Sequence, residues 1–209
     1  MKVVCVNGSP HPEGNTYLTI KAFADELHEN GVKSEVIQVG SGDVPGCIAC
    51  GGCVSSAACA VQDDQFKTWS DKLKNADGVF LAAPVYFGTM PGPMKSFLDR
   101  FFFQCIQGGK MRLKVGASAA ILRRTGGYTT LDDLNRYFFS SEMIIVSASC
   151  PNIVHGRTPG EVVRDIEGMD AVTKLARNMA WILKMIEATK NAIAPPQYSK
   201  KVFMSFIRE

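Results

Sequence analysis

Apolar runs of strand length alternate with helical patterns along this chain, and this alternation restricts its fold more than any other feature. The runs lie at residues 3–6, 36–39, 79–83, 115–122 and 143–146. Most are apolar at nearly every position, which is typical of strands buried on both faces of a parallel sheet. Apolar residues at helical spacing follow each run. The sequence therefore predicts an α/β fold, a doubly wound five-stranded parallel sheet with helices on both faces.

The helices are predicted from apolar residues that recur three or four positions apart. These residues fall within 20–27, 66–73, 94–101, 131–138 and 172–186. Asp63 and Asp64 are expected to cap the second helix, and Pro195-Pro196 is expected to end the last one. Residues 40–63 are small and rich in glycine and cysteine, so no regular structure is expected there.

Length and composition favour one domain. The 209 residues include 46% hydrophobic and 21% charged residues, which is ordinary for a globular protein, and no internal repeat or long linker divides them. We expect one domain over residues 1–190, with a cysteine-rich loop at 40–63, and a tail at 191–209. The apolar residues of the tail are Val202, Phe203, Met204, Phe206 and Ile207. A free tail would be polar, so this one is predicted to pack on a partner subunit.

Several classes of protein are disfavoured by the same composition. A net charge of +3 is too small to predict a nucleic-acid partner, and no apolar run reaches the roughly 18 residues of a membrane helix. The chain enters its first strand almost at once, which predicts no secretory signal and a cytoplasmic location, where thiols stay reduced. In that compartment, seven cysteines indicate metal or redox chemistry before disulfides.

A small polar loop joins the first strand to the first helix. This arrangement directs backbone N–H groups and a helix dipole at an anion. The predicted phosphate contacts are Ser9, His11, Gly14, Asn15 and Thr16. The loop has neither the Gly-x-Gly-x-x-Gly spacing of dinucleotide sites nor the Gly-Lys-Ser/Thr of a P-loop. An ordinary strand-to-helix turn is the alternative.

Two further loops follow strands at the same edge of the sheet, where ligands of such folds bind. The first is Pro84, Val85, Tyr86, Phe87 and Gly88, and the second is Thr125, Gly126, Gly127 and Tyr128. Aromatic side chains at a strand end can flank a planar ring, although singly they are more often core residues. A phosphate loop with two ring-binding loops predicts a mononucleotide, and FMN fits best.

Arginine and histidine side chains are also expected at this edge. Arg123 and Arg124 end the fourth strand, where they could stabilise an anionic reduced flavin or grip a nicotinamide phosphate, although a solvated strand end is the favoured interpretation. Asn152, His155 and Arg157 follow the fifth strand and are expected to cover the flavin or shape a substrate pocket.

The cysteine-rich loop is the most specific signal. Cys47, Cys50 and Cys53 have the spacing C-x2-C-x2-C, and Cys59 follows after five residues. An x2 turn returns successive thiols to one side, and the small residues between them leave amides free to donate to inorganic sulfide. The spacing predicts one [4Fe–4S] cluster; thiols without metal and a Zn(Cys)4 site are the alternatives. Cys5, Cys105 and Cys150 are expected to be buried or incidental thiols.

Together these motifs resemble those of the iron–sulfur flavoproteins, in the wider group of NADPH-dependent FMN reductases and multimeric flavodoxins. The resemblance implies a flavodoxin-like fold, FMN at the three loops, and homodimers or homotetramers with flavins near subunit interfaces. It also implies a [4Fe–4S] cluster close to the flavin of a neighbouring subunit. His11 stands where the family more commonly has a basic residue, which implies a weaker or pH-dependent phosphate contact.

The predicted function is an FMN-dependent oxidoreductase that passes electrons from a reduced donor, NAD(P)H or ferredoxin-like, to a small-molecule or protein acceptor. One alternative is a cluster-free NAD(P)H-dependent FMN or quinone reductase, and another is a non-enzymatic flavin electron carrier. No catalytic side chain is expected, because the flavin supplies the chemistry. Neither nucleic acid nor a membrane is an expected partner.

Overall fold

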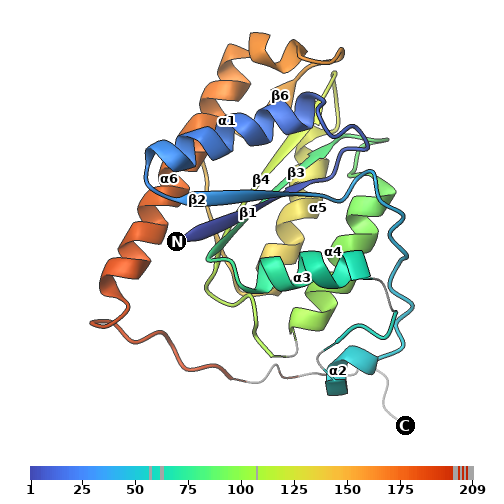
Figure 1. Ribbon diagram of the computed structural model, residues 1–209, viewed down its shortest axis with the longest axis vertical. Helices are drawn as coiled ribbons and strands as arrows, with labels where there is room; N and C mark the ends of the chain where they lie inside the picture. The colour runs from blue at the N-terminus through green and yellow to red at the C-terminus, as the bar shows by residue number, and fades with distance from the viewer. Residues whose placement is uncertain are drawn as a thin grey trace.

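A parallel sheet with strand order β2-β1-β3-β4-β5 forms the centre of the molecule (Figure 1). Its strands are β1 (Lys2–Asn7), β2 (Lys33–Gln38), β3 (Gly78–Pro84), β4 (Val115–Leu122) and β5 (Ile144–Ile145). The computed structural model describes residues 1–56, 58–61, 64–106, 108–199, 202, 204 and 206, without the side chain of Asp64. The predicted doubly wound parallel sheet is confirmed.

Two short strands share the outer position next to β4. β5 pairs with the start of β4 at residues 115–116, and β6 (Ile153–His155) pairs in parallel with its end at 120–122. Between them the chain leaves the edge of the sheet, and Pro151 offers no N–H for pairing there. Within the described residues the sheet thus has six strands, one more than predicted. β6 matters for function because it returns the chain to the carboxyl edge of β4.

Helices cover both faces of the sheet, as predicted (Figure 1). One face carries α1 (Asn15–Glu29) and α6 (Ile166–Thr189), and the other carries α3 (Asp64–Lys74), α4 (Gly92–Ile106) and α5 (Gly127–Ser140). A single-turn 3-10 helix, η1, precedes α6 at Glu161–Arg164. Alternate residues of β1 divide between the two faces: Val3 and Cys5 pack under α1 and α6, whereas Val4 and Val6 pack under α3 and α4. Within the described residues, no helix is long and apolar enough to span a membrane.

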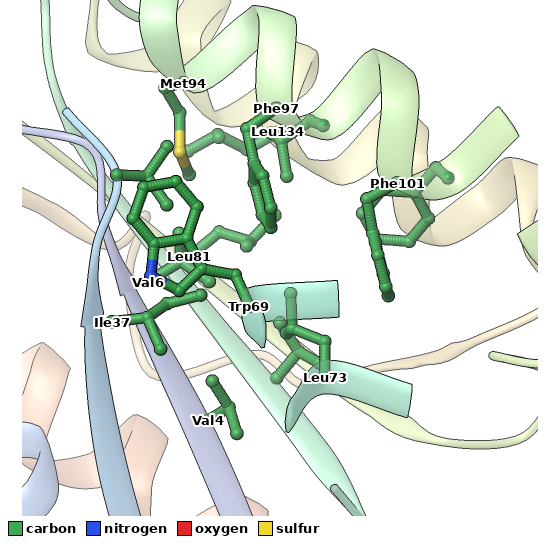
Figure 2. Close-up of a cluster of buried hydrophobic side chains, with 14 of the residues drawn as sticks. Val4, Val6, Ile37, Trp69, Leu73, Leu81, Met94, Phe97, Phe101 and Leu134 are labelled. Carbon is green, nitrogen blue, oxygen red and sulfur yellow. The ribbon is translucent and has the colours of Figure 1, made fainter. Parts of the chain in front are cut away.

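The core on the α3–α5 side is rich in aromatic side chains (Figure 2). Phe97 of α4 is fully buried, and its ring centroid lies 5.7 Å from those of Phe66 and Trp69 and 6.0 Å from that of Phe101. Edge-on and stacked contacts of this kind add about 0.5–1.5 kcal/mol each to the burial of the rings. They fix α3 against α4, and α4 in turn borders the cysteine-rich loop.

Two sequence predictions outside the sheet are wrong. The loop at 40–63 contains a short helix, α2 (Gly52–Ser56), although no regular structure was expected. α6 ends at Thr189, before Pro195-Pro196, where the Thr189 carbonyl accepts from the N–H groups of Ala192 and Ile193. Asp63, one of the two predicted helix caps, lies outside the described residues.

The tail was predicted to pack on a partner subunit, and that stays a prediction. Its described apolar side chains are exposed: Val202, Met204 and Phe206 show 91%, 65% and 89% of their surface. Phe203 and Ile207 lie outside the described residues.

Candidate functional site

A cavity of about 330 Å³ opens at the carboxyl edge of the sheet, between the ends of β1, β3 and β4. It is lined by eight of the predicted contacts, Ser9, His11, Gly14, Asn15, Thr16, Pro84, Val85 and Tyr86. Residues that were not among them also line it, namely Ile121, Leu122, Arg123, Gly156, Arg157 and Pro159. The structure therefore brings the first two predicted loops to one cavity.

Hydrogen bonds hold the loop after β1 in one shape. The N–H of buried Ser9 donates to Asn7 Oδ1 at 3.0 Å, and the Ser9 hydroxyl accepts from the N–H of His11 at 3.1 Å. Gln38 Nε2 donates to the Ser9 carbonyl at 2.6 Å. A Cβ on Gly40 would lie only 2.3 Å from the Gly8 carbonyl. The backbone that follows β2 therefore packs directly on this loop. Ser9 keeps its own hydroxyl hydrogen for a ligand.

The start of α1 supplies the donors of an anion site. Gly14 is its N-cap and makes no side-chain cap, and the amides of a first helical turn have no partner within their own helix. The helix dipole adds partial positive charge at this point. The side chain of Asn15 is already engaged, because it donates to Thr158 O and accepts from Gly160 N–H, both at 2.9 Å. These bonds use the Asn15 carbonyl oxygen and one hydrogen of its amide, which leaves the second hydrogen and the backbone N–H as donors to an anion.

Arginine side chains complete the charge of this cavity. Arg123 directly follows β4 and Arg157 follows β6, and both line the cavity that Ser9 and Thr16 also line. A cavity with a helix N-terminus, hydroxyl groups and two guanidinium groups suits a phosphate. The donor groups in and around the loop after β1 are therefore of the kind that bind the phosphate of FMN.

The loop after β3 forms a tight turn. Tyr86 N–H donates to Thr89 O at 2.8 Å and Thr89 N–H donates to Tyr86 O at 3.1 Å. Phe87 and Gly88 between them have φ of 50° and 85°, which makes this a two-residue turn of the I′ kind. Phe87 sits at the tip, is fully exposed at 109%, and does not line the cavity. Of the two aromatic residues predicted to flank a ring, only Tyr86 faces the cavity.

The third predicted loop is in direct contact with the second. Gly126 has φ of 92°, and a Cβ there would lie 2.8 Å from Val85 Cγ1 and 2.9 Å from Gly88 Cα. Thr129 Oγ1 donates to Gly88 O at 2.5 Å. The close approach needs glycine both for its conformation and for the space. The two loops therefore form one wall.

That wall separates the first cavity from a second one of about 510 Å³. Thr125, Gly126, Gly127 and Tyr128 line the second cavity and not the first. His155 and Asp165 also line it, with His155 Nδ1 3.3 Å from Asp165 Oδ2. Burial raises the pKa of Asp165, but hydrogen bonds from the N–H groups of His155 and Gly168 outweigh it, so the pKa is lowered. Asp165 remains a carboxylate at the N-cap of α6.

The four predicted cysteine ligands line one small pocket between the cysteine-rich loop and α4. Its lining includes Cys47, Cys50, Cys53 and Cys59, together with Arg100 and Phe103. All four thiols are free. Burial raises the pKa of Cys53, and the nearby thiols of the other three cysteines raise it further. The four cysteines thus border the same pocket.

The four cysteines offer the kind of donor, thiolate sulfur, that a [4Fe–4S] cluster takes. Within the described residues no group of three or more His, Cys, Asp or Glu side chains has the geometry to hold one metal ion. A cluster binds each thiolate to a different iron, so it needs four sulfurs around a shared space. The pocket is about 20 Å³, so the loop must open to admit the group. Left-handed backbone at Ala49 (φ 52°) and Gly51 (φ 71°) makes sharp turns between the thiols.

The remaining cysteines behave as predicted. Cys5 and Cys105 are buried, and burial raises their thiol pKa to about 12 and about 11. Cys150 is half-buried and lines the second cavity.

Comparison with known proteins agrees with this architecture. The family model described as NADPH-dependent FMN reductase matches residues 1–158. An iron–sulfur flavoprotein of Methanocaldococcus jannaschii is 33% identical over 194 residues, which are 90% of this chain and 100% of that protein. A solved structure of a flavone reductase superposes with a TM-score of 0.70 at 18% identity, over 90% of this chain and 64% of that one. A WrbA-like flavodoxin from Agrobacterium tumefaciens gives 0.60 at 14% identity, over 88% and 98%.

These matches confirm the predicted family and the flavodoxin-like fold. The likeness to the relative from Methanocaldococcus jannaschii extends over nine-tenths of this chain. The chain belongs to the NADPH-dependent FMN reductase family, as a flavodoxin-like, FMN-dependent oxidoreductase related over most of its length to iron–sulfur flavoproteins.

Proposed function

We propose that this protein carries electrons from a reduced donor to a small-molecule or protein acceptor through FMN and a [4Fe–4S] cluster. FMN would be held by the loop after β1 and the wall formed by residues 84–88 and 125–128, and the cluster by Cys47, Cys50, Cys53 and Cys59. The observation that carries the proposal is the four free thiols around one pocket. Its support outside the structure is the full-length likeness to an iron–sulfur flavoprotein.

The protein's own residues bind and orient in this proposal. FMN can exchange electrons in pairs or singly, and an iron–sulfur cluster exchanges them singly, so the two groups together link the two kinds of partner. The amides of α1 and the hydroxyls of Ser9 and Thr16 would hold the phosphate, and Tyr86 would lie against the ring. The protein would work in the cytoplasm, where the thiols stay reduced.

A second candidate is a cluster-free NAD(P)H-dependent FMN or quinone reductase. The observation that favours it is an open cavity of about 600 Å³ beside the first. Three arginines line it, against two carboxylates: Arg123, Arg157 and Arg164, with Glu161 and Asp165. Guanidinium groups of this kind suit the phosphates of a nicotinamide dinucleotide. A non-enzymatic electron carrier is the third candidate.

Anaerobic purification with assays for iron, acid-labile sulfide and flavin tests the proposal. About four iron, four sulfide and one FMN per chain are expected. Bound FMN without iron would leave the cluster-free reductase as the better candidate. Steady-state turnover of NAD(P)H with a quinone then separates the reductase from a carrier, which shows none.

Replacing both Ser9 and Thr16 by alanine is expected to weaken FMN binding. Loss of two hydroxyl donors to a charged phosphate costs about 1–3 kcal/mol in total, or roughly a 5- to 150-fold rise in Kd. Quenching of FMN fluorescence on titration measures it. Thr173→Ala is the control, since its hydroxyl donates to Met169 O within α6 at 3.0 Å. Equal FMN affinity in the double variant and the control would refute the phosphate assignment.

Deleting residues 195–209 is expected to weaken self-association. We propose that the protein is a homodimer or homotetramer, because the tail exposes the apolar side chains of Val202, Met204 and Phe206 and such groups are stabilised by burial on a partner. Sedimentation velocity at micromolar concentration measures the assembly before and after truncation. A full-length protein that sediments as a monomer would disprove this.

A further inference from the structure

Arg100 is a buried arginine beneath the cysteine-rich loop. It lies on α4, has only 2% of its surface exposed, and lines the same pocket as the four cysteines. Arginine is almost never buried without partners that compensate its desolvation. The groups around Arg100 are therefore expected to compensate the loss of its hydration.

The guanidinium group donates to both ends of the cysteine-rich loop. Arg100 Nη1 lies 3.4 Å from the carbonyl oxygen of Pro45, and Nη2 lies 3.2 Å from that of Val61. Pro45 stands two residues before Cys47, and Val61 two residues after Cys59. One side chain thus ties together the two ends of the segment that contains all four thiols.

An aromatic ring holds the guanidinium group in this position. The Arg100 Cζ lies 3.7 Å from the centroid of the Phe66 ring, which is a cation–π contact. Phe66 is itself fixed in the core against Phe97. A lysine could keep the charge, but its single ammonium group lacks the planar fork that spans two carbonyl groups and stacks on a ring.

Among the described residues, Cys59 packs against the core, but the part of the loop around the first two thiols is open to solvent. α2 buries none of its residues, and Cys47 and Cys50 are exposed. Closing a flexible segment costs conformational entropy, and a cross-link at its ends removes part of that cost before a ligand binds. A clamp at the ends also leaves the middle of the loop able to widen around a bound group.

We propose that Arg100 is the positioning residue of the cysteine site: by bridging the Pro45 and Val61 carbonyls it holds the two ends of the loop together, so that the four thiols stay beside one pocket where a metal group can gather them. The identity of the metal group rests on the proposed function. The clamp, which is the pair of bonds from Arg100 to Pro45 and Val61, is present in the metal-free chain. Arg100 touches the loop backbone and acts on the metal through it.

Titration of the reduced, metal-free protein with Co²⁺ under anaerobic conditions tests the proposal, since cobalt–thiolate absorption reports how many thiols converge. Arg100→Met is expected to weaken Co²⁺ binding about 10- to 100-fold, as loss of supporting groups around metal ligands does. Arg100→Lys is expected to stay at least about fivefold weaker than wild type. FMN affinity is expected to stay unchanged in both, because other loops make that site.

Arg177→Met is the matched control. It removes an arginine that also pairs across elements, with Glu26 at 2.7 Å, but on the opposite face of the sheet. It is expected to bind Co²⁺ as wild type does. A Co²⁺ affinity of Arg100→Met within twofold of wild type, or full recovery in Arg100→Lys, would overturn the clamp.

Two further measurements keep the inference testable on its own. If Arg100→Met fails to bind FMN and is unfolded, Phe66→Leu takes its place: a severalfold loss of Co²⁺ affinity supports the clamp, and a wild-type affinity overturns it.

Hydrogen exchange of amides 46–61 in the metal-free protein should be faster in the Arg100 variants, and unchanged exchange overturns the proposal. A wild-type protein that binds neither iron nor Co²⁺ refutes the proposed function, while the exchange experiment still decides the clamp.

Discussion

Cys59→Ser is expected to lower the iron content from about four per chain to below about one, while FMN stays bound. A cluster with three thiolates exposes one iron to solvent and to competing ligands, so it is lost during purification. Cys59 is half-buried in the pocket that the other three cysteines line, and serine supplies a harder and less acidic donor. The FMN cavity includes none of these residues. Iron, sulfide and flavin assays on anaerobic protein measure the change.

Cys150→Ser is the control for this experiment. Cys150 is also half-buried but lines the second cavity, outside the cysteine-rich loop. It is expected to keep the wild-type iron content. A Cys59→Ser protein with about four iron per chain would show that the fourth ligand lies elsewhere and that the assignment of Cys59 is wrong.

The central sheet and the gathering of the site loops could be predicted because they depend on patterns with a direct physical cause. β1, β3 and β4 are apolar at almost every position since helices cover both of their faces. Parallel strands bring their carboxyl ends to one edge, so the loops after β1 and β3 had to meet there. The short spacing of the cysteines likewise keeps all four in one short loop, where they border one pocket.

Other features depend on contacts between residues far apart in sequence, which no local pattern reveals. β6 has three residues, too few for a periodicity to be recognised. The sequence gives no sign that the side chain of Asn15 also ties the first helix to the loop after β6, through bonds with Thr158 and Gly160. Phe87 reads as an apolar ring at a strand end, but the turn holds it in a left-handed conformation and exposes it.

Arg100 is the strongest case of this kind. Arginine is mostly exposed in proteins, and its neighbours Phe97, Leu98 and Phe101 define a core-facing helix in which it would be assigned to the solvent side. Its burial is compensated by the ring of Phe66, which lies on α3, and by two carbonyl groups of the cysteine-rich loop. Only the packed structure reveals it.

Gly126→Ala is expected to reduce both the stability of the fold and its affinity for FMN. Alanine at φ of 92° costs about 1–2 kcal/mol relative to glycine. Its Cβ would in addition meet Val85 Cγ1 at 2.8 Å and the Gly88 backbone at 2.9 Å, so the wall between the two cavities must open. We expect a total loss of about 2–4 kcal/mol in the free energy of unfolding and at least a tenfold rise in the Kd for FMN.

Gly31→Ala separates the two causes. Gly31 has φ of 74°, in the same left-handed region, but a Cβ there meets nothing within 4 Å. It should therefore lose only the conformational part, about 1–2 kcal/mol, and bind FMN as wild type does. Urea unfolding and FMN titration measure both variants. The difference between the two variants, in free energy of unfolding and in Kd for FMN, measures the effect of the contact between the loops after β3 and β4. If the two variants have the same stability and the same FMN affinity, that contact does not shape the flavin site.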